Sequence, residues 1–454
     1  MFKRVLVANR GEIALRVLRC CRELGVETVA VYSEPDRDSL HVRLADRAVC
    51  IGPREASASY LNQAALITAA RATGAEAIHP GYGFLAESAQ FAAACQESGL
   101  VFIGPPPEAI SRMGHKASAR DTMRAADVPV VPGSEGLVRG LDEALAVAKL
   151  IGYPVLVKAA SGGGGRGMRP AANPDSLRLA FEMAKAEAGA AFGDDGLYLE
   201  RLLTRVRHVE VQILADSHGN VIHLGERDCS SQRRRQKLLE ESPAPGVTPE
   251  LRERMGAAAV RAAASVGYRG AGTVEFMFEP SSNSYYFMEM NTRIQVEHPV
   301  TEMVTGVDLV RQQLLAAADE YLEYQQGDLN WQGHAIECRI NAEDPDSFVP
   351  SAGTVQEYIC PGGPWVRVDS HCYPGYRVLP FYDSLIAKLI VWGSTRGEAI
   401  ARMRRALSEY RITGIKTTIP FHQRLLDHPR FLEGDVSTDM VETELLPITG
   451  PSGL

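Results

Sequence analysis

The stretch Val155-Leu156-Val157-Lys158-Ala159-Ala160-Ser161-Gly162-Gly163-Gly164-Gly165-Arg166-Gly167 decides the fold, because it leads a short apolar strand into four consecutive glycines. Backbone N–H groups without neighbouring Cβ atoms are suited to binding phosphate oxygens. The stretch is not a Walker A loop, since no Gly-Lys-Ser/Thr ends it. Its lysine, Lys158, stands before the glycines at the end of the strand. This order predicts a mobile lid over nucleotide phosphates; a flexible surface loop is the alternative interpretation.

The first third of the chain alternates short β-branched runs with helical patterns. Strands are predicted at 4–8, 28–32, 77–79 and 101–103, and helices at 12–24 and 62–73. This alternation predicts a doubly wound parallel sheet that binds ligands at the carboxyl ends of its strands. The segment Asn9-Arg10-Gly11-Glu12-Ile13-Ala14 follows the first strand where a dinucleotide fingerprint would need Gly-x-Gly-x-x-Gly. A nicotinamide enzyme is therefore disfavoured.

The whole chain has an ordinary globular composition. It has 454 residues, of which 45% are hydrophobic and 23% charged, and its formal net charge is −8. The length predicts two or three domains, and the acidic charge gives no reason to expect nucleic acid or an anionic membrane as partner. No apolar run approaches the roughly 18 residues of a membrane span. Eight sparse cysteines without a Cys-x-x-Cys pair, and an N-terminus without a secretory signal, predict reduced thiols and a cytoplasmic location.

Two predicted strands, 272–278 and 285–290, form a hairpin. If the loop between them is symmetric, Glu275 lies directly opposite Glu289. Facing like charges destabilise a ladder by up to ~1 kcal/mol, so a compensating group is expected. A divalent cation fits, because magnesium takes one or two carboxylates and leaves its other positions to phosphate and water. In the alternative interpretation both carboxylates face solvent.

The segment from Glu289 to Glu297 alternates polar and less polar residues. Its odd positions are Glu289, Asn291, Arg293, Gln295 and Glu297. A half-buried strand would also alternate, but it would not require an acid, an amide and a guanidinium. A fully extended strand would hold the two glutamates roughly 26 Å apart at ~3.3 Å per residue. If both serve one reaction centre, the chain leaves the sheet near 291–295.

The densest basic run is Gln232-Arg233-Arg234-Arg235-Gln236-Lys237. Such a run is usually a solvated face or a nucleic-acid patch. In an acidic chain with a predicted anion site, neutralisation of phosphate or bicarbonate is the favoured interpretation. Nearby Cys229 is interpreted as a small buried residue beside the site rather than a nucleophile. His298 and His334 lack partners at metal-ligand spacing, so both are interpreted as buried, hydrogen-bonded histidines.

Taken together, these stretches resemble biotin carboxylase, the ATP-grasp subunit of acetyl-CoA carboxylase and its relatives. The resemblance is carried by residues 7–14, 79–87, 161–167, 226–230, 289–301 and 337–344, and it extends to about Thr418. It implies an α/β and α+β architecture in three parts. These are an N-terminal Rossmann-like domain with a doubly wound parallel sheet (1–114), an ATP-grasp domain (115–330) with a mobile lid at about 131–203, and a C-terminal mixed α+β domain (331–447).

The resemblance also implies the site residues. The ATP-binding positions are Lys116, Lys158, Gly164, Gly165, Glu200, Arg201, Leu202, Leu203, His208, Arg235, Glu275 and Glu289, and Arg235 stands where the family usually has histidine. The metal ligands are Glu275, Glu289 and Asn291. The bicarbonate pocket is formed by Lys237, Arg293, Gln295, Val296 and Glu297, with Glu297 as general base. The biotin positions are Tyr82, Gly83 and Arg339, and the catalytic residues are Lys237, Arg293, Glu297 and Arg339.

The implied reaction is the ATP- and bicarbonate-dependent carboxylation of biotin through carboxyphosphate, with two Mg²⁺ ions for which Mn²⁺ can substitute. No Met-Lys-Met biotin-acceptor motif occurs near the C-terminus, so biotin is expected on a separate biotin carboxyl carrier protein. The second partner would be a carboxyltransferase for acetyl-CoA, in fatty acid synthesis, or for propionyl-CoA or pyruvate. The family's dimer contacts resemble Arg19, Glu23 and Arg367, which predicts a homodimer, although Pro364-Trp365 replaces an expected aromatic residue.

Two other classes of protein stay open. A different ATP-grasp ligase, of carbamoyl-phosphate or amino-acid-ligating type, would share the flap and the metal acids. It would not need Tyr82 together with Arg339. A nucleotide-binding regulatory subunit without turnover would require the loss of Glu297 or of the metal acids, and all of these are present.

Overall fold

The computed structural model describes residues 1–159, 168–192 and 195–446. The chain forms two compact units. The larger unit contains Met1–Val128, Arg207–Phe278 and the chain from Met288 onwards, and the smaller contains Pro129–Val206 and Glu279–Phe287. No helix in the described part of the chain is both long and apolar enough to span a membrane.

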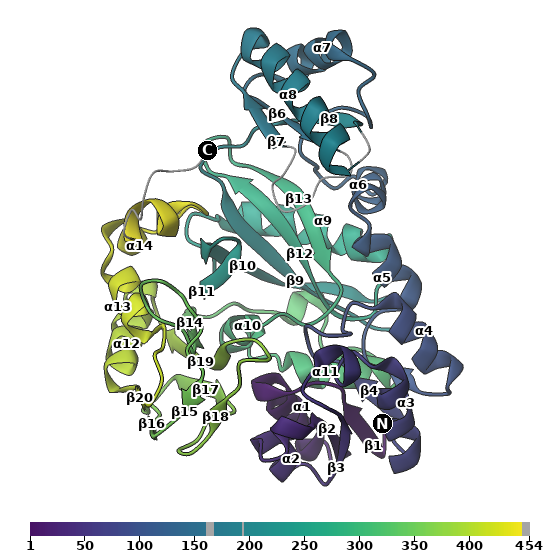
Figure 1. The fold of residues 1–454 in the computed structure, drawn as a ribbon, viewed down its shortest axis with the longest axis vertical. Helices are drawn as coiled ribbons and strands as arrows, with labels where there is room; N and C mark the ends of the chain where they lie inside the picture. The colour runs from purple at the N-terminus through teal and green to yellow at the C-terminus, as the bar shows by residue number, and fades with distance from the viewer. Residues whose placement is uncertain (160–167, 193–194, 447–454) are drawn as a thin grey trace. The chain divides into compact units, whose positions relative to one another are not determined.

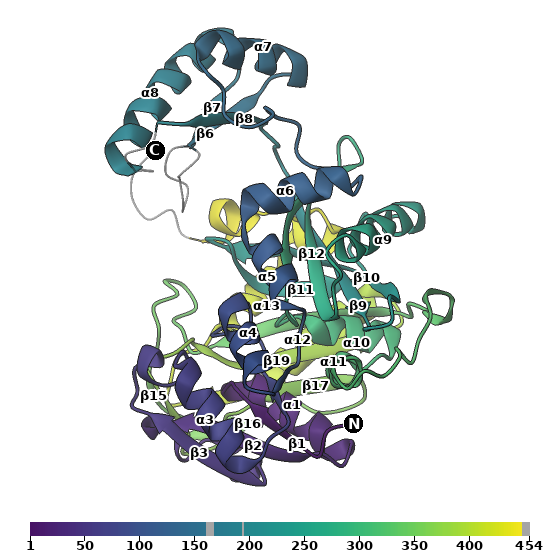
Figure 2. The same ribbon diagram turned by 90° about the vertical axis from the view of Figure 1, so that its right-hand side faces the viewer.

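The N-terminal part of the larger unit is a parallel sheet covered by helices (Figures 1 and 2). Its strands are β1 (Arg4–Val7), β2 (Glu27–Ser33), β3 (Arg47–Gly52), β4 (Ala77–His79) and β5 (Val101–Phe102), in the order β3-β2-β1-β4-β5. The helices are α1 (Gly11–Glu23), α2 (Leu40–Leu44), α3 (Gln63–Thr73), α4 (Ala89–Glu97), α5 (Pro107–Gly114) and α6 (Lys116–Ala125). Val5 and Val7 pack with α1, whereas Leu6 packs with α3 on the opposite face. The predicted doubly wound sheet is confirmed.

The edge strand β3 was not predicted. It contains the short apolar run Ala48-Val49-Cys50-Ile51, yet most of the strand, including Arg47, Ala48 and Cys50, is exposed. It pairs in parallel with β2 from Val29 to Ser33. The edge position explains why a short and largely solvated segment can be a strand here.

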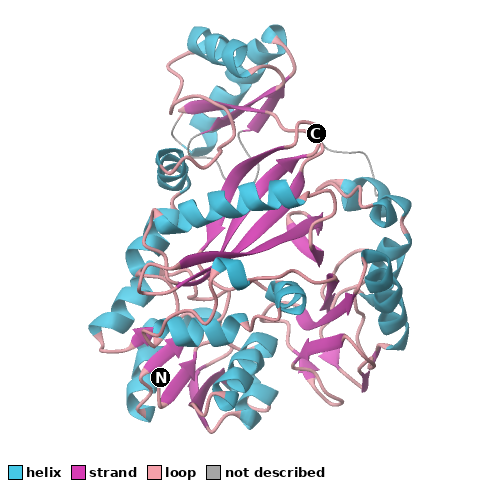
Figure 3. Ribbon diagram, turned by 180° about the vertical axis from the view of Figure 1, so that it is seen from behind, coloured by secondary structure: helices cyan, strands magenta, loops and turns pink. Residues whose placement is uncertain are grey.

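An eight-stranded sheet forms the centre of the larger unit. Its strands are β9 (Arg207–Ala215), β10 (Val221–Arg233), β11 (Gln236–Ser242), β12 (Gly270–Glu279), β13 (Ser284–Asn291), β14 (His334–Asn341), β17 (Val366–Ser370) and β19 (Leu385–Gly393). They follow the order β13-β12-β9-β10-β11-β14-β19-β17. Helix α9 (Pro249–Ala264) lies across β9 and β10 (Figure 3). The helices α10 (His298–Thr305) and α11 (Leu309–Ala317) follow β13.

The C-terminal part continues this sheet and adds its own helical core. Strand β14 pairs with β11 on one side and with β19 on the other. Short strand pairs flank it, namely β15 (Gly353–Thr354) with β18 (Arg377–Val378), and β16 (Glu357–Ile359) with β20 (Arg411–Thr413). The helices α12 (Arg396–Glu409), α13 (Ile419–Asp427) and α14 (Pro429–Glu433) supply apolar residues that pack against β14 and β19. The predicted mixed α+β composition of this part is confirmed.

In its described residues, the smaller unit contains a three-stranded antiparallel sheet and two helices. Its strands β6 (Val155–Ala159), β7 (Met168–Ala171) and β8 (Leu197–Arg201) follow the order β7-β6-β8. The helices α7 (Leu141–Ile151) and α8 (Pro174–Phe192) share its apolar core with Val155 and Val157. The glycine run lies between β6 and β7 and falls outside the described residues.

Candidate active site

Three buried carboxylates surround the ammonium group of Lys237. The Lys237 Nζ lies 2.6 Å from Glu210 Oε2, 2.7 Å from Glu297 Oε1 and 3.0 Å from Glu275 Oε1. Glu275 on β12 stands directly opposite Glu210 on β9. These facing like charges are compensated by Lys237 from the neighbouring basic run. The pairing of Glu275 with Glu289 stays a prediction, although β12 and β13 are neighbours in the sheet.

The chain bends as predicted between Glu289 and Glu297. Strand β13 ends at Asn291, and Glu297 is the N-cap residue of α10. The bend brings Glu297 to the same lysine ammonium that Glu275 contacts. An extended strand could not place Glu297 there, so the bend is what assembles this part of the site.

Arg339 on β14 approaches Glu297 from the other side. Its Nη2 donates to Glu297 Oε2 at 3.0 Å, and its Nε donates to Glu240 Oε1 at 2.6 Å. Glu297 therefore lies between a lysine and an arginine. Both of these cations keep some exposed surface, 11% for Lys237 and 17% for Arg339. An anion can therefore reach charges that the protein has already positioned.

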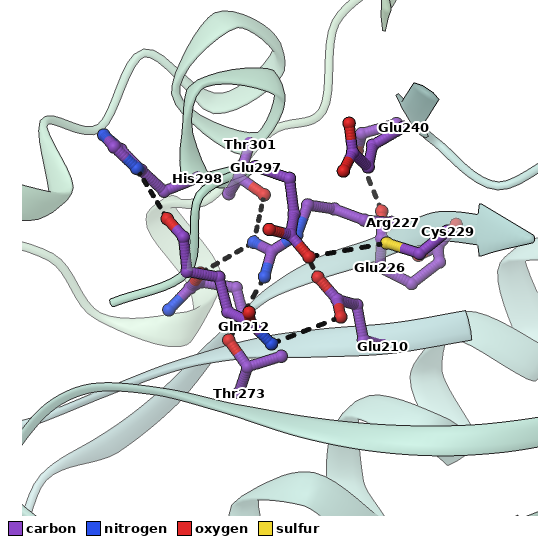
Figure 4. A network of polar contacts seen from close by, with 12 residues as sticks. Glu210, Gln212, Glu226, Arg227, Cys229, Glu240, Thr273, Glu297, His298 and Thr301 are labelled. Atoms are coloured by element: carbon purple, nitrogen blue, oxygen red, sulfur yellow. Dashed lines mark hydrogen bonds and ion pairs between the residues drawn. The ribbon is translucent and has the colours of Figure 1, made fainter. Parts of the chain in front are cut away.

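Arg227 on β10 has a different role from these two cations. Its side chain has no exposed surface. The guanidinium donates to Glu210 at 2.6 Å, and to Gln212, Thr273 and Thr301 at 2.7 to 3.1 Å. Figure 4 shows this group between the sheet and helix α10. Arg227 fixes the geometry of Glu210 and of α10.

Of the predicted metal acids, Glu275 belongs to this cluster, and Glu289 lies on the neighbouring strand β13. Glu275 Oε1 accepts hydrogen bonds from Asn291 Nδ2 at 2.8 Å and from Gln295 Nε2 at 2.9 Å, and its Oε2 lies 3.1 Å from His208 Nε2. Glu289 is half-buried on β13. Carboxylate and amide oxygens on neighbouring strands are the hard donors that magnesium prefers, so these residue types fit the ion.

Arg293 crosses the bend in the chain. Its Nη2 donates to Asn291 Oδ1 at 3.0 Å and its Nη1 to Gln295 Oε1 at 3.3 Å, while its Nε contacts Glu87 at 2.9 Å. The two amides of Asn291 and Gln295 thus each accept from Arg293 and donate to Glu275. Of the predicted bicarbonate residues, Arg293 and Gln295 are thus linked through Glu275 to Lys237 and Glu297. The carbonyl of Val296 instead accepts from Lys388.

The predicted biotin residue Tyr82 lies in a loop that several hydrogen bonds keep in place. Asn9 Nδ2 donates to the carbonyls of Pro80 and Tyr82, both at 2.7 Å. The backbone N–H of Gly81 donates to His79 Nδ1 at 3.0 Å. The Tyr82 hydroxyl donates to Glu12 Oε1. Gly83 follows with φ of +69°, a conformation that glycine adopts without strain.

Burial and the charge cluster set the pKa values of the acids. Burial opposes ionisation of Glu297, but Lys237, Arg339 and Arg227 outweigh it and hold its pKa well below the usual range. Burial raises the pKa of Glu210, and the charge of Glu297 raises it further. Burial also raises the pKa of Glu240 to about 7, although Arg339 opposes the shift. At neutral pH Glu297 is therefore an ionised carboxylate able to accept a proton.

Cys229 is the small buried residue that the sequence predicts. Its Sγ lies 3.7 Å from Glu297 Oε1. Burial raises the pKa of the Cys229 thiol well above its usual value, and the charge of Glu210 adds to this. The thiol stays protonated at neutral pH, which argues against a role as nucleophile. His298 and His334 are buried and hydrogen-bonded, to the Gln295 carbonyl and to Glu241 respectively.

The remaining predicted ATP positions are distributed over both units. In the smaller unit, the Lys158 ammonium on β6 forms an ion pair with Glu200 on β8, Arg201 pairs with Glu279 at 2.7 Å, and Leu202 and Leu203 follow β8 as half-buried residues. In the larger unit, Lys116 begins α6, and Arg235 lies exposed in the turn between β10 and β11. Gly164, Gly165 and the side chain of Lys116 lie outside the described residues.

Residues without a predicted role complete the site. Glu210 and Arg227 support the Lys237 cluster, and Glu240 supports Arg339. A signal for Glu210 was available, since His208, Glu210 and Gln212 alternate with apolar residues and share one face of β9. The polar segment containing Arg227 gave no such pattern.

Three family models match consecutive parts of the chain. They are "Biotin carboxylase, N-terminal domain" at residues 1–110, "Carbamoyl-phosphate synthase L chain, ATP binding domain" at 115–325 and "Biotin carboxylase C-terminal domain" at 337–443. Together with the sheets described above, they define an ATP-grasp ligase.

Named relatives make the assignment specific. Biotin carboxylase 1 of Bacillus subtilis (strain 168) is 57% identical over 444 residues, which are 98% of this chain and 99% of that protein. The biotin carboxylase of Nostoc sp. is 59% identical over 442 residues, 97% of this chain and 99% of that one. The dimeric biotin carboxylase domain of Hydrogenobacter thermophilus 2-oxoglutarate carboxylase, solved with MgADP, ADP and bicarbonate, gives a TM-score of 0.87 at 52% identity and covers 97% of both chains. The chain belongs to the biotin carboxylase family.

Proposed function

We propose that this protein carboxylates biotin with bicarbonate at the expense of ATP, and that Glu297 is the general base. One observation carries the proposal: the buried carboxylate of Glu297 lies between two partly exposed cations, Lys237 and Arg339. Bicarbonate is a weak nucleophile and an anion. A site for it needs a base that accepts its proton and cations that hold the resulting charge.

The first step follows from these contacts. Bicarbonate would share Lys237 with Glu297 and would be held by Arg293 and Gln295. Because the substrate takes part of the positive charge that depresses the pKa of Glu297, the carboxylate becomes a stronger base when the site is occupied. The deprotonated oxygen then attacks the γ-phosphate of ATP, giving carboxyphosphate and ADP. Magnesium, held by Glu275, Glu289 and Asn291, would supply charge neutralisation on the phosphates.

The second step takes place at the biotin end of the site. Carboxyphosphate breaks down to CO₂ and phosphate, and phosphate takes the proton of the biotin ureido nitrogen. Arg339 would bind the ureido oxygen as negative charge develops on it, while Tyr82 and Gly83 would hold the ring. Arginine suits this role because it stays charged and offers a planar fork of donors. The nitrogen then attacks CO₂ and forms carboxybiotin.

Bicarbonate-dependent ADP release measured with and without free biotin tests the function. Turnover that requires bicarbonate and rises with biotin supports it. ATP turnover indifferent to both reagents would disprove it. Bicarbonate-dependent turnover that biotin leaves unchanged, but that ammonia or an amino acid stimulates, would favour the carbamoyl-phosphate or amino-acid-ligating alternative.

The wider setting of the enzyme is part of the same proposal. We infer three functional domains at 1–114, 115–330 and 331–447, with a lid at about 131–203. Biotin would arrive on a carrier protein and leave for a carboxyltransferase, and that transferase would choose the final acyl acceptor. The eight cysteines are all free thiols, which supports a reducing compartment such as the cytoplasm.

We also propose a homodimer that uses Arg19, Glu23 and Arg367. Arg19 and Glu23 are exposed on α1, and Arg367 lies on β17 with ion pairs to Glu302 and Asp369. Light scattering at micromolar concentration should give twice the chain mass of 49.3 kDa. The charge reversal Arg19→Glu should shift the molecule toward the monomer.

A further inference from the structure

A fully buried lysine lies behind the candidate site. Lys388 on β19 has no exposed side-chain surface. Its Nζ donates to the carbonyl oxygen of Val296 at 2.8 Å, and lies 3.3 Å from Glu12 Oε1 and 3.9 Å from Asp369 Oδ2. Burying an ammonium costs several kcal/mol, which only good pairing offsets. A hydrophobic residue would fill this position at lower cost, so the charge calls for an explanation.

The contact with Val296 fixes the backbone beside the proposed base. Val296 precedes Glu297, and its carbonyl belongs to the peptide bond that carries the Glu297 N–H. Glu297 is the N-cap residue of α10, but its side chain makes no capping hydrogen bond in the described structure. It points instead to Lys237 and Arg339. Lys388 therefore holds this turn at a point where the usual helix cap does not.

The contact with Glu12 leads to the opposite end of the site. Glu12 lies in the first turn of α1, and its Oε1 accepts a hydrogen bond from the Tyr82 hydroxyl. The same carboxylate oxygen thus faces both Lys388 and Tyr82. Asp369 has a second cation, since Arg367 donates to both of its oxygens at 2.9 and 2.8 Å. Glu12 has Lys388 as the one cation among its described ion pairs.

We propose that Lys388 and Glu12 are positioning residues. They hold the turn at Val296 and Glu297, where bicarbonate would bind, in a fixed relation to the loop at 80–83, where biotin would bind. The proposal rests on the function assigned above. Neither residue touches a substrate: Lys388 acts through the Val296 carbonyl and Glu12 through the Tyr82 hydroxyl. The pair joins β19, the start of α10, α1 and the loop after β4. It thereby couples the step that activates bicarbonate to the step that accepts CO₂.

The variants Lys388→Met, Glu12→Gln and their combination test this coupling, with Lys416→Met as control. Methionine keeps the length of the lysine stem without its charge. Lys416 is 66% exposed and pairs with Asp344, so its replacement should leave every kinetic constant unchanged. For Lys388→Met we expect the KM for bicarbonate to rise about 10- to 100-fold, as when other supporting residues of a site are removed. The KM for ATP should stay within twofold.

The Glu12→Gln and double variants separate positioning from general destabilisation. Glu12→Gln should raise the KM for biotin about tenfold, with little change in biotin-free, bicarbonate-dependent turnover. Lys388→Met should raise the KM for biotin as well, because Glu12 loses the lysine that faces it. In the double variant the two effects on the KM for biotin should therefore combine to less than their product, because each single change removes the same contact. Melting temperatures report folding separately.

Several outcomes would overturn the proposal. One is Lys388→Met with wild-type KM values for bicarbonate and biotin. Another is a variant whose KM values for ATP, bicarbonate and biotin all rise together with a loss of thermal stability, which would indicate a structural role only. If Lys388→Met does not fold, the test uses Glu12→Gln, Tyr82→Phe and their combination. Effects on the KM for biotin that multiply in the combined variant would refute coupling through Glu12. A wild-type enzyme without bicarbonate-dependent turnover would refute the proposed function instead.

Discussion

The buried cationic side chains of this protein differ in how much of their surface is exposed to solvent. Arg227 has no exposed surface, whereas Lys237 and Arg339 keep part of their surface open. All three lie beside carboxylates, so charge alone does not distinguish support from substrate binding. A residue that must bind an incoming anion needs charged side-chain surface that the anion can reach. This criterion assigns Arg227 to support.

The amide substitution Glu297→Gln tests the base directly. It removes the proton acceptor and keeps the shape of the side chain. We expect kcat for bicarbonate-dependent ATP turnover to fall by about 10²- to 10⁴-fold, the usual contribution of a general base. The KM for ATP should change less than threefold, because no nucleotide contact is assigned to Glu297. Steady-state kinetics check both numbers, and a collapse of ATP binding would show that the assignment as base is wrong.

The elevated pKa of Glu240 predicts a stability that depends on pH. The folded carboxyl has a pKa of about 7 against an ordinary 4.5. Folding therefore retains a proton that the unfolded chain releases between these values. The contribution is present in full below pH 4.5 and is lost as pH rises to about 7, at about 1.4 kcal/mol per pKa unit, or roughly 3 kcal/mol in total.

Glu240→Gln should remove this dependence while its amide oxygen still accepts from Arg339. The difference in melting temperature, wild type minus variant, should therefore decrease as pH rises from 5 to 8. The exposed Glu97 on α4 supplies the control variant Glu97→Gln, which should follow the wild type at every pH. A constant difference between wild type and Glu240→Gln would contradict the assigned pKa.

At the level of elements, the sequence predicted the N-terminal sheet well and the centre of the site poorly. The strands 4–8, 28–32 and 77–79 are apolar and buried, so their burial follows from their composition. Strand β10 is the opposite case, since it contains Glu226-Arg227-Asp228-Cys229-Ser230-Ser231-Gln232 and is nevertheless buried. Nothing within such a segment indicates burial, because its charges are paired from outside it: Arg227 and Asp228 by Glu210 and Arg207 of β9, and Glu226 by Arg252 of α9.

A distance argument and the family resemblance each point to features of the site that local pattern does not show. The predicted bend near Asn291 followed from a distance argument about two glutamates, and β13 ends at that residue. Lys237 was assigned through resemblance and lies in the acid cluster. The neighbours Arg234 and Arg235 occupy an exposed turn. A run of like charges in a sequence does not show which member points inward; only the register of β10 against β11 does.

The loop that presents Tyr82 depends on glycine at position 81. Gly81 has φ of +62°, and a Cβ there would lie 3.0 Å from Asn9 Nδ2 and 3.1 Å from Ile13 Cγ1. Gly83 has φ of +69° with nothing within 4 Å of a Cβ. Gly83→Ala should therefore cost only the left-handed conformation, about 1–2 kcal/mol.

Gly81→Ala should cost more, because it also displaces Asn9 from the Pro80 and Tyr82 carbonyls. We expect its melting temperature to lie below that of Gly83→Ala and its KM for biotin to rise severalfold. Thermal unfolding and biotin-dependent kinetics measure the two effects. Equal stabilities of the two variants would mean that Asn9 does not anchor the loop.

For the whole molecule, one continuous sheet places acids and cations from distant parts of the sequence in one cluster. Strands β9 and β12 supply Glu210 and Glu275, β11 supplies Lys237, and β14 supplies Arg339. A ligand that binds this cluster binds the folded chain and not the unfolded one. Its affinity therefore adds to the stability of the whole molecule.

Magnesium nucleotide provides the test of that linkage. At a nucleotide concentration of 100 times Kd, stability should rise by about 2.7 kcal/mol, and removal of the metal with EDTA should lower the gain, because carboxylates facing phosphates repel them when no cation lies between. Glu289→Gln should reduce the magnesium-dependent part of the shift in melting temperature and leave the nucleotide-free value near that of the wild type. Glu97→Gln serves again as control. A magnesium-dependent shift that is the same in Glu289→Gln and in the wild type would exclude Glu289 as a metal ligand. The ion would then have to be bound by Glu275 with its neighbours Glu210 and His208, because the ligand atoms of these three residues lie within 4.8 Å of one another.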